Sequence, residues 1–171
     1  MKLERVAKIK YSKYIDATSV RDIALSILKE LGLMAGSKKE KAIYLAKYVS
    51  DNIRTTRGYD KPPYPRETLK SGYGTCFAKA VLLTSMLRAV GFTEDEVYTV
   101  VCKLHKVNSY LQGLFHALVI VRLDDRKLLV LNPSSTELYI EVDDIRGIEG
   151  VAKVYCLFND KKGYIWIPED S

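Results

Sequence analysis

Cysteine is scarce in this chain of 171 residues, which has only Cys76, Cys102 and Cys156. Three thiols cannot all pair, and their spacing does not resemble a secreted disulfide framework, so we expect free thiols in a reducing compartment. The sequence has no apolar run of about 18 residues that could span a membrane, and its first residues contain no apolar core of signal-peptide length. These absences favour a cytoplasmic protein with no membrane partner.

Motifs for metal and nucleic-acid binding are missing as well. Cys102 and His105 have the spacing of half a zinc site, but no second paired half follows, so we expect no metal and no cofactor. The formal net charge is +6, with the basic excess in the N-terminal half. These basic residues alternate with apolar ones and form no arginine-rich run, which favours a solvated face. A nucleic-acid-associated protein is the least favoured interpretation.

Hydrophobic residues make up 47% of the chain, which is enough to bury a core without disulfides or metal. The sequence contains no internal repeat, no low-complexity segment and no linker long enough to divide it. We therefore expect residues 1–171 to form a single domain.

Apolar residues recur with helical spacing in the first half of the chain. One amphipathic helix is predicted to follow residues 18–19 and to end at Gly32, and a second begins with the capping box at residues 37–40. Residues 55–74 then form a connection rich in Pro, Gly and Tyr, in which a short helical turn could start at Pro65. Connections of this length usually build a site or are disordered, and the tyrosines favour packing.

A third helix is predicted to begin near Thr75 and is apolar on nearly all sides, so we expect it to be buried at the centre of the fold. Thr75 can cap this helix and Gly91 can end it, which places Cys76 in the first turn. Exposed N–H groups and the helix dipole should stabilise a thiolate there, lowering the thiol pKa from about 8.5 to roughly 3.5–7.5. The polar residues of this helix are Lys79, Thr84, Ser85 and Arg88.

After Gly91 the pattern changes to short runs rich in Val, Ile, Leu and Tyr, which predict β-strands. Helices followed by strands indicate an α+β fold. The predicted strands are residues 97–104, 114–123, 127–131, 151–158 and 164–167.

Two polar side chains interrupt these strands. His116 lies in an otherwise apolar strand, and Asn132 ends the next one before a proline. Directly paired antiparallel residues share a face, and a turn centred on Asp124 would pair His116 with Asn132. A two-residue turn at 124–125 would place them on opposite faces, but the absence of glycine there disfavours it.

Cys76, His116 and Asn132 are the side chains that an acyl-transfer triad requires. The thiolate would attack a carbonyl carbon, the imidazole would move protons, and the carboxamide would fix the tautomer and orientation of the ring. The backbone N–H of Cys76 would supply one donor to the oxyanion. Candidates for the second donor are hydroxyls of the preceding loop: Tyr59, Tyr64 and Tyr73.

These motifs resemble the transglutaminase-like core, a branch of the papain-like cysteine protease fold that includes transglutaminases, peptide N-glycanases and microbial proteases. The resemblance covers about residues 40–135 and rests on Gly-Thr-Cys76 opening a helix that ends Leu-Arg-Ala-Val-Gly-Phe, on His116-Ala in a strand, and on Asn132-Pro ending the next. It implies an α+β fold in which N-terminal helices and a central buried Cys-bearing helix pack on an antiparallel β-sheet. It also implies that Cys76, His116 and Asn132 form the catalytic triad.

The chain departs from the usual family pattern at Thr75 (often Asp), Leu118 (often Trp) and Asn132-Pro-Ser (often Asp-Pro-Thr). An asparagine orients a ring but supplies no negative charge to an imidazolium. The resemblance implies an enzyme that hydrolyses or transfers an amide acyl group through a thioester, acting on a peptide bond or a Gln or Asn carboxamide of a protein or peptide. The alternative is a catalytically silent fold that serves as a protein-interaction module. The acceptor and the oligomeric state stay open.

Overall fold

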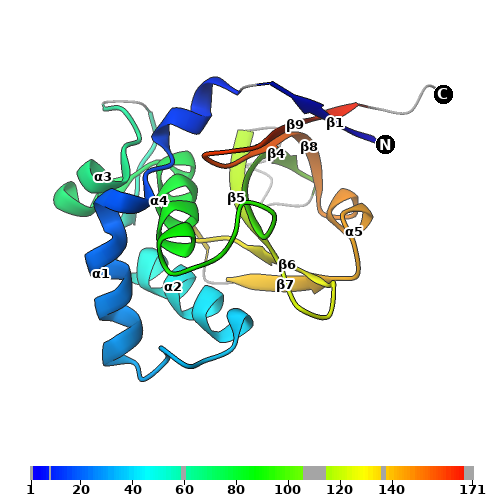
Figure 1. Ribbon diagram of the computed structural model, residues 1–171. Coiled ribbons are helices and arrows are strands. Elements are labelled where there is room, and N and C mark those ends of the chain that lie inside the picture. The colour runs from blue at the N-terminus through cyan, green and yellow to red at the C-terminus, as the bar shows by residue number, and fades with distance from the viewer. Residues whose placement is uncertain (1, 8, 59–60, 106–114, 136–137, 168–171) are drawn as a thin grey trace.

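The computed structural model describes residues 2–7, 9–58, 61–105, 115–135 and 138–167. It is an α+β fold in which helices cover one face of a seven-stranded antiparallel sheet (Figure 1). The elements are β1 (Lys2–Val6), the 3-10 helix η1 (Lys10–Tyr14), α1 (Ala17–Glu30), α2 (Lys38–Asn52), β2 (Arg54–Thr55), α3 (Pro65–Ser71), β3 (Tyr73–Gly74), α4 (Cys76–Ala89), β4 (Val97–Leu104), β5 (Phe115–Arg122), β6 (Leu128–Leu131), β7 (Tyr139–Val142), α5 (Arg146–Glu149), β8 (Ala152–Phe158) and β9 (Gly163–Ile167).

The strand order in the sheet is β1-β9-β8-β4-β5-β6-β7, and β2 and β3 form a separate parallel pair. The α+β architecture that the resemblance implied is confirmed, including the buried Cys-bearing helix on an antiparallel sheet. Among the described residues, no helix has the length and apolar content needed to cross a membrane.

The predicted helix starts follow from side-chain caps. The capping box is confirmed, because the Ser37 hydroxyl accepts from the Glu40 N–H at 3.1 Å and the Glu40 carboxylate accepts from the Ser37 N–H at 3.4 Å. Helix α3 begins at Pro65, as predicted. Helix α1 starts earlier than predicted, at Ala17, because the carboxylate of Asp16 accepts from the N–H at the third helical position.

Helix α4 lies at the centre of the molecule, between the other helices and strands β4 and β5 (Figure 1). Its polar side chains are paired, which is what burial requires. Thr84 and Thr99 of β4 share a hydroxyl hydrogen bond of 2.7 Å, and both are fully buried. The Arg88 guanidinium makes two hydrogen bonds, of 2.8 and 3.1 Å, to the carboxylate of Asp160. These pairs fix α4 against the sheet and therefore fix the position of its first turn.

Both faces of the sheet are apolar. One core cluster fills the space between the helices and strands β4 to β6, and another lies on the opposite face, where α5 packs. Trp166 belongs to this second cluster and is only 6% exposed, so it is a packing anchor on this face of the sheet. Strands β1 and β7, at the two edges, were not predicted, because β1 has charged residues at three of its five positions and β7 is exposed along most of its length.

The β5–β6 hairpin has a different register from the predicted one. Val119 pairs with Leu131, so the turn is centred on Asp125 and not on Asp124. The loop consists of three residues and ends at Arg126, which has a left-handed φ of 68°. A turn followed by one left-handed residue is a common three-residue hairpin loop, and it can form without glycine at some cost in strain. The sequence contained no residue that marked this register.

The Thr84–Thr99 hydrogen bond provides a test of how α4 is docked. Thr84→Val leaves the Thr99 hydroxyl buried without its partner, so we expect the free energy of unfolding to fall by about 1–3 kcal/mol. Replacing both threonines by valine removes both polar groups and should recover most of this loss. Urea denaturation measures the three variants, and a double variant as unstable as the sum of the single ones would contradict the pairing.

Candidate active site

The turn before α4 places Cys76 at the first helical position. Thr75 is the N-cap, and its hydroxyl accepts from the N–H of Ala78 at 3.2 Å, as predicted. Gly74 allows the chain to pass close to the helix, because a Cβ at this position would lie 3.0 Å from the Cβ of Ala78. The N–H of Cys76 has no acceptor within the helix, as for any first-turn residue, and it can therefore point at a bound group.

His116 and Asn132 meet across the β5–β6 hairpin. The corrected register shifts the pairing by two residues, which is an even number, so the two side chains stay on one face as diagonal neighbours. His116 Nε2 lies 3.1 Å from Asn132 Oδ1. The N–H of Ser134 donates to the same oxygen at 3.2 Å, which identifies it as the acceptor end of the carboxamide. Nε2 therefore carries a proton and donates, and Nδ1 is the nitrogen left for another partner.

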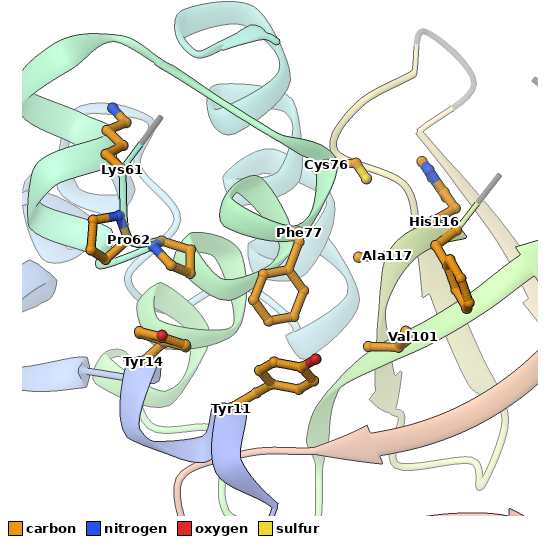
Figure 2. A pocket seen from close by; sticks show the side chains of 11 residues that line it. Tyr11, Tyr14, Lys61, Pro62, Cys76, Phe77, Val101, His116 and Ala117 are labelled. Atoms are coloured by element: carbon orange, nitrogen blue, oxygen red, sulfur yellow. The ribbon is translucent and has the colours of Figure 1, made fainter. Parts of the chain in front are cut away.

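Cys76 and His116 line the same cavity, which has a volume of about 750 Å³. Figure 2 shows their side chains facing each other from α4 and β5. The backbone N–H of Ala117 in β5 favours the thiolate form of Cys76 and lowers its pKa, which places the sulfur close to this strand. Apart from Lys61, the rest of the wall is mainly aromatic and apolar and includes Tyr11, Tyr14, Pro62, Pro63, Phe77 and Phe115.

The pKa of the Cys76 thiol differs from the sequence prediction, which was wrong in direction. Burial raises the pKa and outweighs the groups that favour a thiolate, which are the N–H groups of Ala117, Phe77 and Cys76 itself and the charge of Lys79. The helix terminus is in the predicted place, but the thiol is partly buried, and this loss of hydration disfavours the thiolate. The resting protein therefore holds a neutral thiol at pH 7.

The imidazole is neutral as well. Burial lowers the pKa of His116, and the hydrogen bond to Asn132 only partly opposes this. With Nε2 donating to Asn132, a neutral ring presents Nδ1 as a lone-pair acceptor. The site thus contains a thiol and a base that can take its proton, which suits proton transfer during attack on a carbonyl better than a preformed ion pair.

Lys79 is a charged residue whose importance the sequence analysis missed. It is 2% exposed, and its ammonium donates to the carbonyl oxygen of Ile53 at 2.6 Å and to the hydroxyl of Thr55 at 3.0 Å. Both partners are neutral. Lys79 lies three residues after Cys76, a spacing that puts both on one side of the helix. Burial lowers the pKa of Lys79, and the Cys76 thiolate would raise it. A single lysine in an otherwise apolar stretch of helix was the available signal.

The three tyrosines proposed as oxyanion donors do not gain support from the geometry. Tyr59 lies outside the described residues. Tyr64 and Tyr73 are not among the residues that line the cavity. Tyr64 is 40% exposed, and its ring contacts Tyr14 with centroids 5.0 Å apart. The tyrosines of the cavity wall are instead Tyr11 and Tyr14, from η1 (Figure 2).

The other two cysteines differ from Cys76 in that neither lines the cavity. Cys102 is fully buried, and burial raises its pKa to about 12. Cys156 is half-buried, and burial raises its pKa as well. His105 is exposed, and its Nε2 bonds the carbonyl oxygen of Glu149 at 2.8 Å. Within the described part of the chain, no three His, Cys, Asp or Glu side chains converge as a metal site would require.

A family model described as the transglutaminase-like superfamily matches residues 26–133, which is more than half of the chain. No curated protein matches by sequence. The family match contains all three residues of the predicted triad and excludes η1, β8 and β9.

Several solved structures share the fold. LapG from Legionella pneumophila is 16% identical, with a TM-score of 0.61 over 88% of each chain. Its calcium-bound form is 15% identical, with a TM-score of 0.61 over 92% of this chain and 91% of that one. A candidate cysteine protease from Cytophaga hutchinsonii is 13% identical, with a TM-score of 0.60 over 94% of this chain and 54% of that one. At these identities the likeness shows the fold alone.

The charge of Lys79 should be measurable in the reactivity of Cys76. Lys79→Met removes a positive charge that favours the thiolate, so the thiol pKa should rise further and alkylation by iodoacetamide at pH 8 should slow several-fold. Peptide mass spectrometry assigns the rate to Cys76. Thr55→Val is the matched control, because it removes one hydrogen bond of Lys79 and keeps the charge. Equal slowing in both variants would attribute the effect to loosened structure and reject the electrostatic role.

Proposed function

The chain belongs to the transglutaminase-like superfamily, and on this premise we propose that it is a cysteine-dependent enzyme that cleaves or transfers an amide acyl group of a protein or peptide. The proposed triad is Cys76, His116 and Asn132. The observation that carries the proposal is that His116 lines the same cavity as Cys76 and bonds Asn132 through Nε2, which leaves Nδ1 available to the thiol. The shared fold of LapG and of the candidate cysteine protease supports it.

The proposed reaction begins with a neutral thiol and a neutral imidazole. His116 Nδ1 takes the thiol proton as Cys76 Sγ attacks the carbonyl carbon, and the backbone N–H of Cys76 donates to the oxyanion that forms. The C–N bond then breaks, and His116 gives its proton to the leaving amine. A water or an acceptor amine attacks the thioester and passes its proton to His116. The C–S bond breaks, and the sulfur regains its proton from the imidazolium.

Asn132 has a limited and specific role in this scheme. Its Oδ1 accepts from Nε2–H, so it selects the tautomer that leaves Nδ1 free of a proton. A carboxamide carries no charge and therefore does little to stabilise the imidazolium that forms after proton transfer. That imidazolium is a short-lived carrier, and its proton moves on to the leaving amine.

The triad can be tested without knowing the natural substrate. A peptide library digested by the protein and analysed by mass spectrometry reveals cleaved bonds, and a peptidyl vinyl sulfone reports the reactivity of the thiol. Cys76→Ala should abolish cleavage, and His116→Ala should reduce it by about 10²–10⁴-fold. Asn132→Ala should cause a smaller loss, because the base remains. Cleavage that survives Cys76→Ala would refute the triad. Equal, slow labelling of all three cysteines in a native protein that cleaves nothing would indicate the silent interaction module instead.

The pH dependence follows from the direction of the His116 pKa. Burial lowers this pKa below the ordinary 6.5, so the ring stays neutral and able to accept a proton at mildly acidic pH. We expect kcat/KM for a cleaved library peptide to persist below pH 6.5 and to fall only when the ring finally protonates. Asn132→Asp places a negative charge beside Nε2, raises the His116 pKa and should move this acid limb to higher pH. An acid limb above pH 6.5 in the native protein would contradict the neutral resting ring.

A further inference from the structure

An exposed aromatic residue borders the proposed catalytic histidine. Phe115, next to His116 in β5, lines the cavity and is 65% exposed, which makes it the most exposed large apolar side chain among the described residues. Its ring lies beside that of Tyr155 in β8, with centroids 5.3 Å apart. Aromatic surface left open beside a reactive cavity is characteristic of binding sites.

Two lysines flank these rings. Lys103 in β4 pairs directly with Phe115 on one side and with Lys153 in β8 on the other. Their ammonium groups lie 5.0 and 5.5 Å from the ring centroids of Phe115 and Tyr155, respectively. We call Lys103, Phe115, Lys153 and Tyr155 the Phe115 patch.

The positive charge of the Phe115 patch has no carboxylate partner in the described part of the chain. Like charges directly opposite each other on neighbouring strands destabilise a sheet. Among the described residues, neither Lys103 nor Lys153 forms an ion pair with a carboxylate, although other lysines of the chain do. Two adjacent cations without an internal anion, beside exposed aromatic rings, form a surface that is complementary to acidic groups next to an apolar side chain.

The Phe115 patch continues directly into the cavity. Phe115 belongs to both, and Val101, two residues before Lys103 on the same strand, lines the cavity wall. Alternate residues of a strand share a face, so the wall runs from Val101 to Lys103 without interruption. A peptide bound over the Phe115 patch would therefore extend into the space between Cys76 and His116.

We infer that the Phe115 patch binds the part of the substrate next to the reactive amide, and that this part is a peptide segment with a bulky apolar residue flanked by acidic residues. The inference rests on the proposed function, because it describes the substrate of that site. The apolar side chain packs against Phe115 and Tyr155, and the carboxylates pair with Lys103 and Lys153.

Half of the Phe115 patch lies outside the family core. Lys153 and Tyr155 follow the matched residues 26–133, and so does the rest of β8. The family motifs around Cys76, His116 and Asn132 do not include these two positions. The inferred preference for a substrate with acidic and apolar residues therefore follows from side chains of this chain and not from the family motifs.

The test measures peptide binding by the full chain carrying Cys76→Ala, so that no turnover occurs. The probes are fluorescein-labelled Gly-Glu-Phe-Ala-Glu-Gly, the same peptide with both Glu replaced by Lys, and the same peptide with Phe replaced by Ser. By fluorescence anisotropy at low salt, we expect the acidic Phe peptide to bind about 10-fold or more tightly than either variant peptide. Added salt should weaken this binding, because exposed charge pairs are screened.

Lysine variants test whether the acidic Phe peptide binds at the Phe115 patch. In the Cys76→Ala background, Lys103→Gln and Lys153→Gln should each weaken binding of the acidic Phe peptide by about 2- to 5-fold. Lys127→Gln is the control, because Lys127 is also exposed but lies beyond the opposite end of β5 from His116, and it should have no effect. All of these are surface changes, and thermal unfolding verifies that the variants are folded. Equal binding of the acidic and basic peptides, or equal weakening by Lys127→Gln, would overturn the inference.

The peptide-binding test of the Phe115 patch and the labelling test of the proposed function can fail independently. Vinyl sulfone labelling of Cys76 tests the thiol and the base and does not require the acidic segment. If labelling depends on His116 but the acidic Phe peptide does not bind, the Phe115 patch is rejected and the catalytic proposal stands. If the peptide binds as expected but Cys76 is unreactive, the patch is supported as a peptide site and the catalytic proposal fails.

Discussion

The burial of α4 is the constraint on which the site depends. A helix that is apolar on nearly every side must be enclosed, and enclosure by helices on one side and β4 and β5 on the other leaves only its first turn at the cavity. The same packing partly buries the Cys76 thiol and raises its pKa. The position and the protonation state of this thiol thus have one cause. A more exposed helix would favour the thiolate but would not hold the sulfur against β5.

Sequence patterns predicted the parts of this fold that depend only on residues near one another in the sequence. The capping box at Ser37, the N-cap at Thr75 and Pro65 at the start of α3 are each decided by a few neighbouring residues, and the structure has them where they were predicted. The run rich in Val, Tyr and Leu that predicted a strand at residues 97–104 located β4 with its exact bounds. The edge strand β7 was missed because it is mostly exposed, so its residues do not carry the apolar pattern of a buried strand.

The features that could not be predicted depend on three-dimensional surroundings. The hairpin register depends on Arg126 adopting a left-handed conformation, which nothing in its side chain signals. The thiol pKa depends on how many side chains close over Cys76, and the helix terminus alone predicted the opposite direction. The loop tyrosines were reasonable oxyanion donors by proximity in sequence, but the cavity wall takes its tyrosines from η1, more than sixty residues before Cys76. Long-range packing decides all three.

In the proposed mechanism, the charges near the site bear on the presence of an asparagine beside His116. Proton transfer from the thiol to the imidazole creates an anion and a cation without changing the net charge of the cavity. The buried ammonium of Lys79 favours the Cys76 thiolate, whereas the uncharged carboxamide of Asn132 adds no negative charge beside the imidazolium. In the proposed reaction, the imidazolium would therefore be the less stable member of the pair and would readily give its proton to the leaving amine. An aspartate at this position would stabilise the imidazolium and hold that proton more tightly, so the neutral Asn132 would favour its release.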